Sequence, residues 1–260
     1  MTLPHFFLER QILSEETQDF FPLRLTDEDL RHARVLRLMP GEHIAVIDAA
    51  QDYFECAVAD FNEDLLNVRI TTKCNEITPR PSVVLVQGLS KGEKMDEVIR
   101  HATELGVDAF VPFLSERSIV KLDAKKTANR MRRWRSIAKS AAMQSGQRSV
   151  PEISEPLALD EVCKMFRYAA AILVCWEEAQ GTGIRDALNR ALSIQDIALE
   201  DARVAVVVGP EGGLSAHEVD AFLSCNRFAE SVSLGQSILR TETAGVVAPA
   251  LVLYELGVLA

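Results

Sequence analysis

Two stretches decide the fold of this chain: AVVVGPEGGLSAHEV at residues 205–219 and SVSLGQSILRTETA at residues 231–244. Each opens with a short apolar run that predicts a buried strand, at residues 205–208 and 231–234. A glycine-bearing turn follows each run and leads into a helix. Alternating strands and helices build a parallel sheet, which binds ligands where the carboxyl ends of neighbouring strands leave a crevice. We therefore predict an α/β fold in which both turns line one site.

The first turn, residues 209–213, combines three glycines with a proline. Glycine lets a ligand approach the backbone closely, because no Cβ stands in front of it. Ser215 and Glu218 have capping-box spacing, which predicts a helix start. After the second turn, residues 235–240, Thr241 is predicted to cap a long apolar helix. Neither turn has the spacing of a phosphate loop or a dinucleotide-binding motif, so ordinary strand-to-helix turns remain an equal alternative on composition alone.

Composition limits the class of protein. The chain has 260 residues, 48% of them hydrophobic, which fits two ordinary domains. Its longest apolar run, residues 244–254, is too short to span a bilayer, and its start lacks the features of a signal peptide. We expect a cytoplasmic protein without a membrane segment. The five cysteines and five histidines are scattered without ligand spacing, so we expect neither disulfides nor a metal site.

The charge is unevenly distributed. The formal net charge is −10, which by itself argues against a nucleic-acid partner. Between residues 117 and 148, however, ten lysines and arginines face a single acid, Asp123, which gives a local net charge of +9. Periodicity predicts a helix over residues 126–144 in this segment. Its basic side can be merely solvated, but such density on an acidic chain favours a polyanionic partner.

The chain divides into two parts in sequence. Residues 1–74 predict a small, mostly β unit, with a helix at 26–38 and strands at 43–47, 53–61 and 65–72. Residues 75–82 contain two prolines and predict a linker. Residues 83–260 alternate strands at 82–87, 108–113 and 169–175 with helices at 91–105 and 183–194. The apolar helix that begins at Thr241 predicts burial on all sides, in the core or in a subunit interface.

The sequence motifs VVVGPEGGLSAHEV and VSLGQSILRTETA closely resemble the C-terminal signature of the SPOUT-class RNA methyltransferases. They resemble in particular the RsmE-type family, which methylates N3 of a uridine in 16S ribosomal RNA. Residues 87–107 and 134–153 resemble the same family, whereas His5, Ser140 and Met143 depart from its pattern. The resemblance implies a SPOUT-type parallel sheet with a C-terminal trefoil knot at residues 83–260, a PUA-like RNA-binding β-barrel at residues 1–74, and a homodimer.

The resemblance also implies S-adenosylmethionine as the cofactor, lying across the two turns and the end of the strand at residues 169–175. Its adenine would accept and donate main-chain hydrogen bonds, while Trp176 beside it is expected to pack in the core. The implied cofactor-binding residues are Val174, Cys175, Gly209, Pro210, Glu211, Gly212, Gly213, Leu234, Gly235, Ile238, Leu239, Thr241 and Ala244.

Two residues are candidates for the chemistry. Uracil N3 carries a proton that must leave, so either a base removes it or a cation stabilises the anion. We assign the cation role, or substrate orientation, to Arg240. We assign to Glu242 a role as base or as the partner of an arginine. The alternatives are a plain salt bridge for Arg240 and a helix N-terminal charge for Glu242.

The substrate is expected to be 16S ribosomal RNA near the decoding region, either free or in the assembled small subunit, held by phosphate contacts. A different RNA target or atom, a non-catalytic RNA-binding or ribosome-assembly module, and a nucleotide enzyme remain alternatives. Lys91 and Lys94 could equally be ordinary exposed lysines. The candidate RNA-binding residues are Arg24, Arg34, Lys91, Lys94, Arg117, Arg130, Arg132, Arg133, Arg135, Lys139 and Arg148.

Overall fold

The computed structural model describes residues 3–62, 65–74, 79–120, 123–195 and 197–259. The chain forms two compact units: Met1–Thr78 with Ala142–Ser149, and Pro79–Ala141 with Val150–Ala260. Part of the predicted linker, residues 75–78, lies outside the described residues. Among the described residues, no helix combines the length and apolar character that crossing a bilayer requires.

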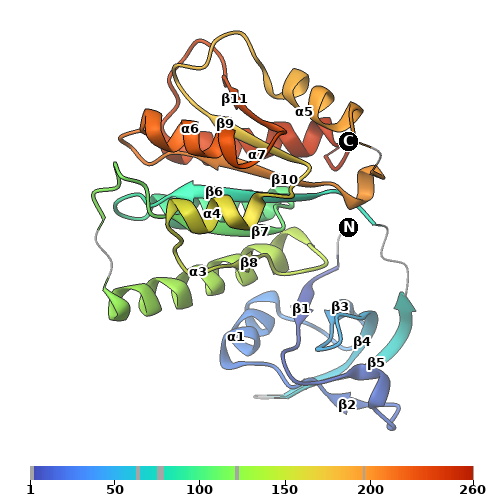
Figure 1. The fold of residues 1–260 in the computed structure, drawn as a ribbon. Helices are drawn as coiled ribbons and strands as arrows, with labels where there is room; N and C mark the ends of the chain where they lie inside the picture. Colours follow the sequence, from blue (N-terminus) through green and yellow to red (C-terminus); the bar gives the residue numbers. More distant parts are fainter. Residues whose placement is uncertain (1–2, 63–64, 75–78, 121–122, 196, 260) are drawn as a thin grey trace. The chain divides into compact units, whose positions relative to one another are not determined.

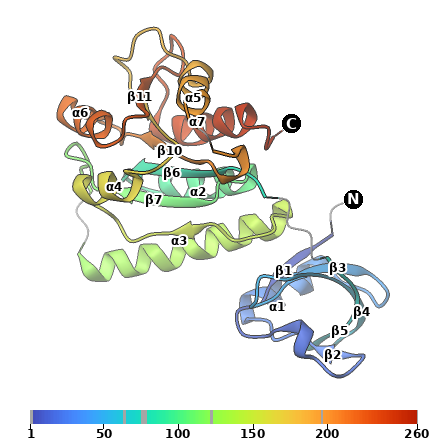
Figure 2. The same ribbon diagram turned by 45° about the vertical axis from the view of Figure 1, so that its right-hand side comes forward.

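The first unit is built on one five-stranded sheet in the order β1-β3-β4-β5-β2 (Figure 2). β1 runs parallel to β3, and the other pairs are antiparallel. The helix α1 begins at a capping box in which Asp29 N donates to Thr26 Oγ1. The elements are β1 His5–Phe7, η1 Leu13–Glu15, β2 Phe21–Pro22, α1 Asp27–Leu36, β3 His43–Ile47, β4 Tyr53–Asn62 and β5 Leu65–Cys74.

The second unit is an α/β domain whose six strands are all parallel, in the order β11-β9-β10-β6-β7-β8 (Figure 1). The strands are β6 Ser82–Gly88, β7 Ala109–Phe113, β8 Glu152–Ile153, β9 Ala171–Cys175, β10 Arg203–Val208 and β11 Ala229–Val232. The helices are α2 Lys94–Leu105, α3 Ala124–Ser145, α4 Leu159–Phe166, α5 Ile184–Ser193, η2 Leu199–Asp201, α6 Ala216–Cys225 and α7 Thr241–Glu255. The predicted α/β fold with a parallel sheet is confirmed.

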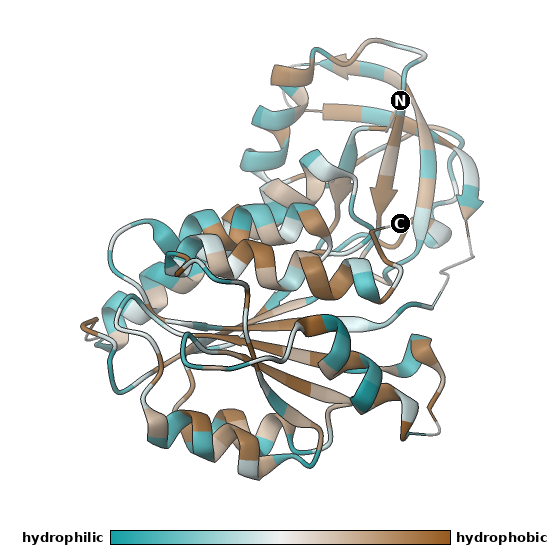
Figure 3. Ribbon diagram, turned by 90° about the horizontal axis from the view of Figure 1, so that it is seen from above, coloured by the Kyte–Doolittle hydropathy of each residue, from teal (hydrophilic) through white to brown (hydrophobic). Residues whose placement is uncertain are grey.

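The strands of the second unit are hydrophobic along most of their length (Figure 3). Their alternate residues belong to two separate core clusters, so both faces of the sheet are buried. One face carries Leu85, Leu173 and Val206, which pack against α2, α3, α5 and α7. The other carries Val86, Val174 and Val207, which pack against α4 and α6. Burial on both faces makes the sheet the rigid support for the loops at its carboxyl edge.

Three predicted details are wrong. β9 lies between β10 and β11, so the strands before the two turns are not neighbours. β11 ends at Val232, and the second loop therefore covers residues 233–240. Thr241 does not cap α7: Arg240 occupies the cap position, and the Thr241 hydroxyl is bonded elsewhere. On α7, Leu251 and Tyr254 are exposed in the single chain, so burial of this helix in a subunit interface stays a prediction.

The remaining elements follow local signals in the sequence. Ser215 caps α6, because its hydroxyl accepts from Glu218 N and the Glu218 carboxylate accepts from Ser215 N. α2 ends at Gly106, whose φ of 96° is a left-handed conformation that suits glycine. The short α4 and β8 were not predicted. Because Ser215 caps α6, this helix begins where expected and fixes the end of the first loop.

Candidate functional site

A cavity of about 440 Å³ opens at the carboxyl ends of β9 and β10. Its size lies within the range of small-molecule sites. Both glycine-bearing turns contribute to it, because the end of β9 spans the gap between them. The cavity is lined by Lys94, Cys175, Trp176, Glu177, Val208, Gly209, Pro210, Glu211, Gly213, Leu214, Ser233, Leu234, Gly235, Gln236, Ser237, Ile238, Leu239, Arg240, Thr241 and Ala244.

The first loop, residues 209–213, is tightly folded. A Cβ on Gly209 would lie 2.8 Å from the carbonyl carbon of Gly213, so only glycine allows this closed turn. Gly213 has a φ of +70°, and a Cβ there would lie 2.6 Å from Glu177 Oε1. Arg117 Nη1 donates to Gly212 O at 3.0 Å from outside the loop. Gly209 and Gly213 therefore allow the tight turn that forms this wall of the cavity.

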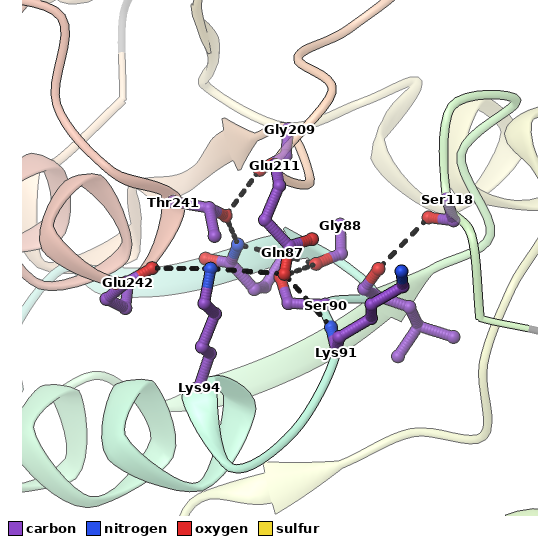
Figure 4. A network of polar contacts seen from close by, with 11 residues as sticks. Gln87, Gly88, Ser90, Lys91, Lys94, Ser118, Gly209, Glu211, Thr241 and Glu242 are labelled. Carbon is purple, nitrogen blue, oxygen red and sulfur yellow. Dashed lines mark hydrogen bonds and ion pairs between the residues drawn. The ribbon is translucent and has the colours of Figure 1, made fainter.

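Thr241 fastens the first loop to the sheet and to α7 (Figure 4). Its hydroxyl donates to Gly209 O at 2.6 Å and accepts from Gln87 Nε2 at 2.9 Å. Gln87 and Thr241 are both buried. Because a buried hydroxyl without partners costs about 1–3 kcal/mol, this pair of bonds fixes the loop against the end of β6.

Lys94, in the first turn of α2, forms ion pairs with the first loop and with the start of α7 (Figure 4). Its ammonium lies 3.2 Å from Glu211 Oε1 and 3.4 Å from Glu242 Oε2. The backbone N–H of Lys91 also donates to Glu211 Oε1, at 3.1 Å. Glu242 Oε2 is buried and accepts no hydrogen bond within the described part of the chain, so Lys94 balances its charge. One lysine thus sits between the first loop and the start of α7.

The site also shifts the ionisation of its groups. The hydrogen bond to Glu211 raises the pKa of Lys94, with a smaller contribution from Glu242. Burial acts to raise the pKa of Glu211, but backbone N–H groups and Lys94 lower it overall. Both groups therefore stay charged near neutral pH. Burial raises the pKa of Cys175 to about 12, so this cysteine lines the cavity as a neutral thiol.

The second loop, residues 233–240, has fewer anchors. Ser233 N donates to Thr182 O at 2.9 Å, and Gly235 N donates to Ser233 Oγ at 3.2 Å. Ile238 is 86% exposed although it is apolar and lines the cavity. The Arg240 side chain makes no hydrogen bond or ion pair with any described residue. This loop therefore offers an apolar contact and a free cation at the mouth of the cavity.

Most residues predicted to hold the cofactor line this cavity, but two do not. Val174 points into the core between the sheet and α4 and α6, and Gly212 faces Arg117. Of the two residues predicted for the chemistry, Arg240 lines the cavity and Glu242 lies beside it, paired with Lys94. The sequence analysis missed Glu177, Val208, Leu214, Ser233, Gln236 and Ser237. Their position next to the predicted motifs was the available signal. Trp176 packs against the core as expected and also lines the cavity.

The residues predicted to contact RNA do not form one group. Arg133 lies 2.8 Å from Glu93 and 2.5 Å from Asp96, so its charge holds α3 against α2. Lys94 is paired in the cavity, and Arg117 contacts the first loop. In the first unit, the Arg148 guanidinium lies over the Tyr53 ring. The residues whose charge is exposed along α3 are Arg132 and Arg135, and Arg130 and Lys139 are half-buried. Arg24, Arg34 and Lys91 are exposed outside this helix.

No three His, Cys, Asp or Glu side chains are grouped so that they could hold a metal ion, within the residues that the structure describes. Parallel strands with a cavity of this size at their carboxyl edge are typical of α/β proteins that bind a small molecule there. Comparison with known proteins narrows the class.

The sequence pattern of the family described as "RNA methyltransferase domain" matches residues 78–253, and the chain belongs to this family. Among curated proteins, "Ribosomal RNA small subunit methyltransferase E" of Bacillus subtilis is 31% identical over 97% of this chain and 97% of its own. The protein of that name from Mycobacterium bovis is 34% identical over 85% of this chain and 82% of its own. The predicted resemblance to RsmE-type methyltransferases is confirmed.

Solved structures of similar proteins have the same fold as this chain. The crystal structure of a ribosomal RNA small subunit methyltransferase E from Neisseria gonorrhoeae, bound to S-adenosyl methionine, is 27% identical. It superposes with a TM-score of 0.76 over 97% of each chain. The similarity therefore covers both units of this chain and not the methyltransferase domain alone.

Proposed function

We propose that this chain transfers the methyl group of S-adenosylmethionine to N3 of a uridine in 16S ribosomal RNA. The observation that carries the proposal is the convergence of the two motif-bearing loops on one cavity of about 440 Å³. Family membership supplies the reaction class, and the relatives' names supply the small-subunit RNA. The site's location near the decoding region and the assembled subunit as substrate belong to the same proposal, as does a cytoplasmic location.

The cavity fits this cofactor. Gly209 and Gly213 line the cavity and allow the first loop to fold tightly there, which suits a flat nucleoside held by main-chain groups. Leu234, Ile238 and Leu239 give apolar contacts, and Glu177 and Glu211 place negative charge near a positively charged sulfonium. When bound, the cofactor supplies an activated methyl group, so the protein needs chiefly to align donor and acceptor.

The chain's own residues then have distinct roles. Arg240 orients the uracil and stabilises the negative charge that develops when N3 loses its proton, because its guanidinium is free at the cavity mouth. Glu242 pairs with Lys94, in place of the arginine partner considered from sequence, and keeps the start of α7 in position. The proton leaves to an acceptor supplied by the substrate or solvent.

The finer architecture of the family completes the proposal. We propose a PUA-like barrel from the five strands of the first unit and a trefoil knot around the second loop and α7. The burial of Thr241 between Gly209 and Gln87 supports the knot. The exposed Leu251 and Tyr254 on α7 support a homodimer. An experimental map that traces α7 without passing it through a loop would contradict the knot, and sedimentation equilibrium tests the dimer.

Mass spectrometry of small-subunit RNA from cells with and without this protein tests the reaction. We expect 3-methyluridine only when the protein is present. Arg240→Ala should abolish methylation while S-adenosylmethionine affinity, measured by calorimetry, stays within a few fold, because the side chain lies at the mouth of the cavity. Arg100→Ala, which removes an exposed arginine from α2, is the control. Full turnover by Arg240→Ala would remove this residue from the mechanism.

A further inference from the structure

A second group of arginines lies at the opposite edge of the sheet, at the amino ends of the strands. We propose that this amino-edge surface, formed by Arg167, Tyr168, Arg203, Arg227 and Phe228, binds a single-stranded segment of RNA. Arg203 begins β10, while the other residues lie in the short connections that lead into β9 and β11. None of these residues was predicted to have a function.

Hydrogen bonds show that the three connections lie side by side. Ala170 N donates to Arg203 O at 2.8 Å, and Ile172 N donates to Phe228 O at 3.2 Å. The buried Asn226 amide donates to Phe166 O at 3.0 Å and to Ala169 O at 2.9 Å. Since adjacent strands are about 4.8 Å apart, β11, β9 and β10 together span roughly 10 Å. The residues therefore form one continuous surface.

Each arginine of this surface lies over an aromatic ring. The guanidinium carbon is 5.9 Å from the ring centroid for Arg167 over Tyr168, 5.1 Å for Arg203 over Phe166, and 4.7 Å for Arg227 over Phe228. All three arginines are exposed. In the described part of the chain, none of them forms an ion pair or donates a side-chain hydrogen bond. Stacking orders each guanidinium and leaves its N–H groups free to bind an anion.

Two arginines on α5 of this domain are instead paired with carboxylates. On α5, Arg185 pairs with Glu255 at 2.9 Å and Arg190 pairs with Glu230 at 2.5 Å. The acids nearest in sequence to the amino-edge surface are Asp201, two residues before Arg203, and Glu230, two residues after Phe228. Neither is paired with an arginine of this surface, and Glu230 is paired with Arg190. In a chain of net charge −10, three arginines left without carboxylate partners mark a place for an anion from another molecule.

The aromatic residue identifies the kind of anion. Tyr168 is 91% exposed, so one face of its ring is available beside the Arg167 guanidinium. Unstacked bases of single-stranded RNA lie on such rings while arginines contact the flanking phosphates. An acidic peptide would use the arginines and leave the ring unused. The inference rests on the proposed RNA substrate and adds a second place where that RNA is held.

The distance from the cavity fixes what this contact does. β10 has 6 residues, so its two ends are separated by about 17 Å. A nucleotide in the cavity and one on the amino-edge surface are therefore different parts of the RNA. The surface should strengthen binding and leave the methyl-transfer step unchanged.

Fluorescence anisotropy with a labelled oligouridylate tests the proposal on the full-length protein. Arg203→Gln with Arg227→Gln should weaken binding and lower the slope of log K against log salt by about 1.4, since each lost phosphate contact accounts for about 0.7 on a single strand. The matched control, Arg185→Gln with Arg190→Gln, removes the same charge and should leave the slope unchanged. Tyr168→Ala should weaken binding about tenfold, and Tyr168→Phe should retain it.

Each outcome decides the proposal. Equal weakening by the two double variants would reduce the effect to net charge and overturn it, as would unchanged binding by Tyr168→Ala. Displacement of the oligouridylate by polyglutamate at equal charge concentration would assign the surface to a protein and also overturn it. In methylation assays, the variant Arg203→Gln with Arg227→Gln should have a higher KM for RNA, with unchanged kcat and unchanged cofactor affinity. If the chain methylates no RNA but the oligouridylate results hold, the proposed function fails and this inference stands.

Discussion

The two loops of the cavity differ in what holds them. The first loop is closed by contacts between glycines, bonded to Thr241 and Arg117, and tied to α2 through Glu211 and Lys94. The second loop is held near Ser233 and by Leu234 and Leu239, which pack against the core, whereas 86% of Ile238 is exposed. The first loop is thus formed before a ligand arrives, whereas the second has apolar surface that only a ligand or another chain can bury. Changes in the two loops should therefore have different effects.

Gly209→Ala should have the largest effect. Its Cβ would lie 2.8 Å from the Gly213 carbonyl carbon and 2.9 Å from Leu214 N, and backbone cannot yield as a flexible side chain does. Overpacking of this kind costs about 3 kcal/mol, which corresponds to roughly 100-fold in cofactor affinity measured by calorimetry. Gly183→Ala is the control, because nothing lies within 4 Å of its added Cβ. Normal affinity in Gly209→Ala would mean that the first loop is not rigid.

Ile238→Ser should leave the stability of the free protein unchanged and weaken the cofactor complex. The side chain is already exposed, so the melting temperature should not move, whereas burying an isoleucine contributes about 1.5–3 kcal/mol, or roughly tenfold or more. Calorimetry and thermal melting on the same sample separate the two effects. A lowered melting temperature would show that the second loop is packed in the free protein, contrary to the comparison.

Lys94→Met should have the smallest effect, about fivefold on cofactor affinity, because partly exposed ion pairs contribute about 1 kcal/mol. Lys91→Met should change nothing, since only the Lys91 backbone binds Glu211. The lowered pKa of Glu211 makes its contribution present above its ordinary value of 4.5 and lost as pH falls. The raised pKa of Lys94 makes its contribution present below 10.5 and lost as pH rises. The ratio of cofactor affinity between the unchanged protein and Lys94→Met should therefore be the same at about pH 6 and at about pH 9. A ratio that differs between these two pH values would contradict this ion pair.

Much of this fold could be predicted because its signals are local. β3 matches its predicted bounds, and α3 and α5 lie within two residues of theirs, since apolar periodicity and caps act over a few residues. The order of the strands could not be predicted in the same way. Both loops follow apolar strands, but nothing near them in sequence indicates that β9 separates β10 from β11.

In the candidate site, too, local features could be predicted from the sequence, whereas contacts between distant residues could not. Glycine positions and the residues around them were found as motifs, but the partners of charged groups were not. Arg133 counted as an RNA contact because its neighbours in sequence are basic, whereas its partners Glu93 and Asp96 come from another helix. The role of Thr241 was missed for the same reason, because Gly209 and Gln87 are distant in sequence.

The Thr241 hydroxyl has a consequence for how the protein is made. Residues of α7 complete both the wall of the cavity and the anchor of the first loop, and α7 follows every strand of the parallel sheet in sequence. A ribosome must therefore release α7 before a binding-competent cavity exists. Copies that are cut short in translation between β11 and α7 carry every strand of this sheet yet hold no cofactor, so they are inactive from the outset.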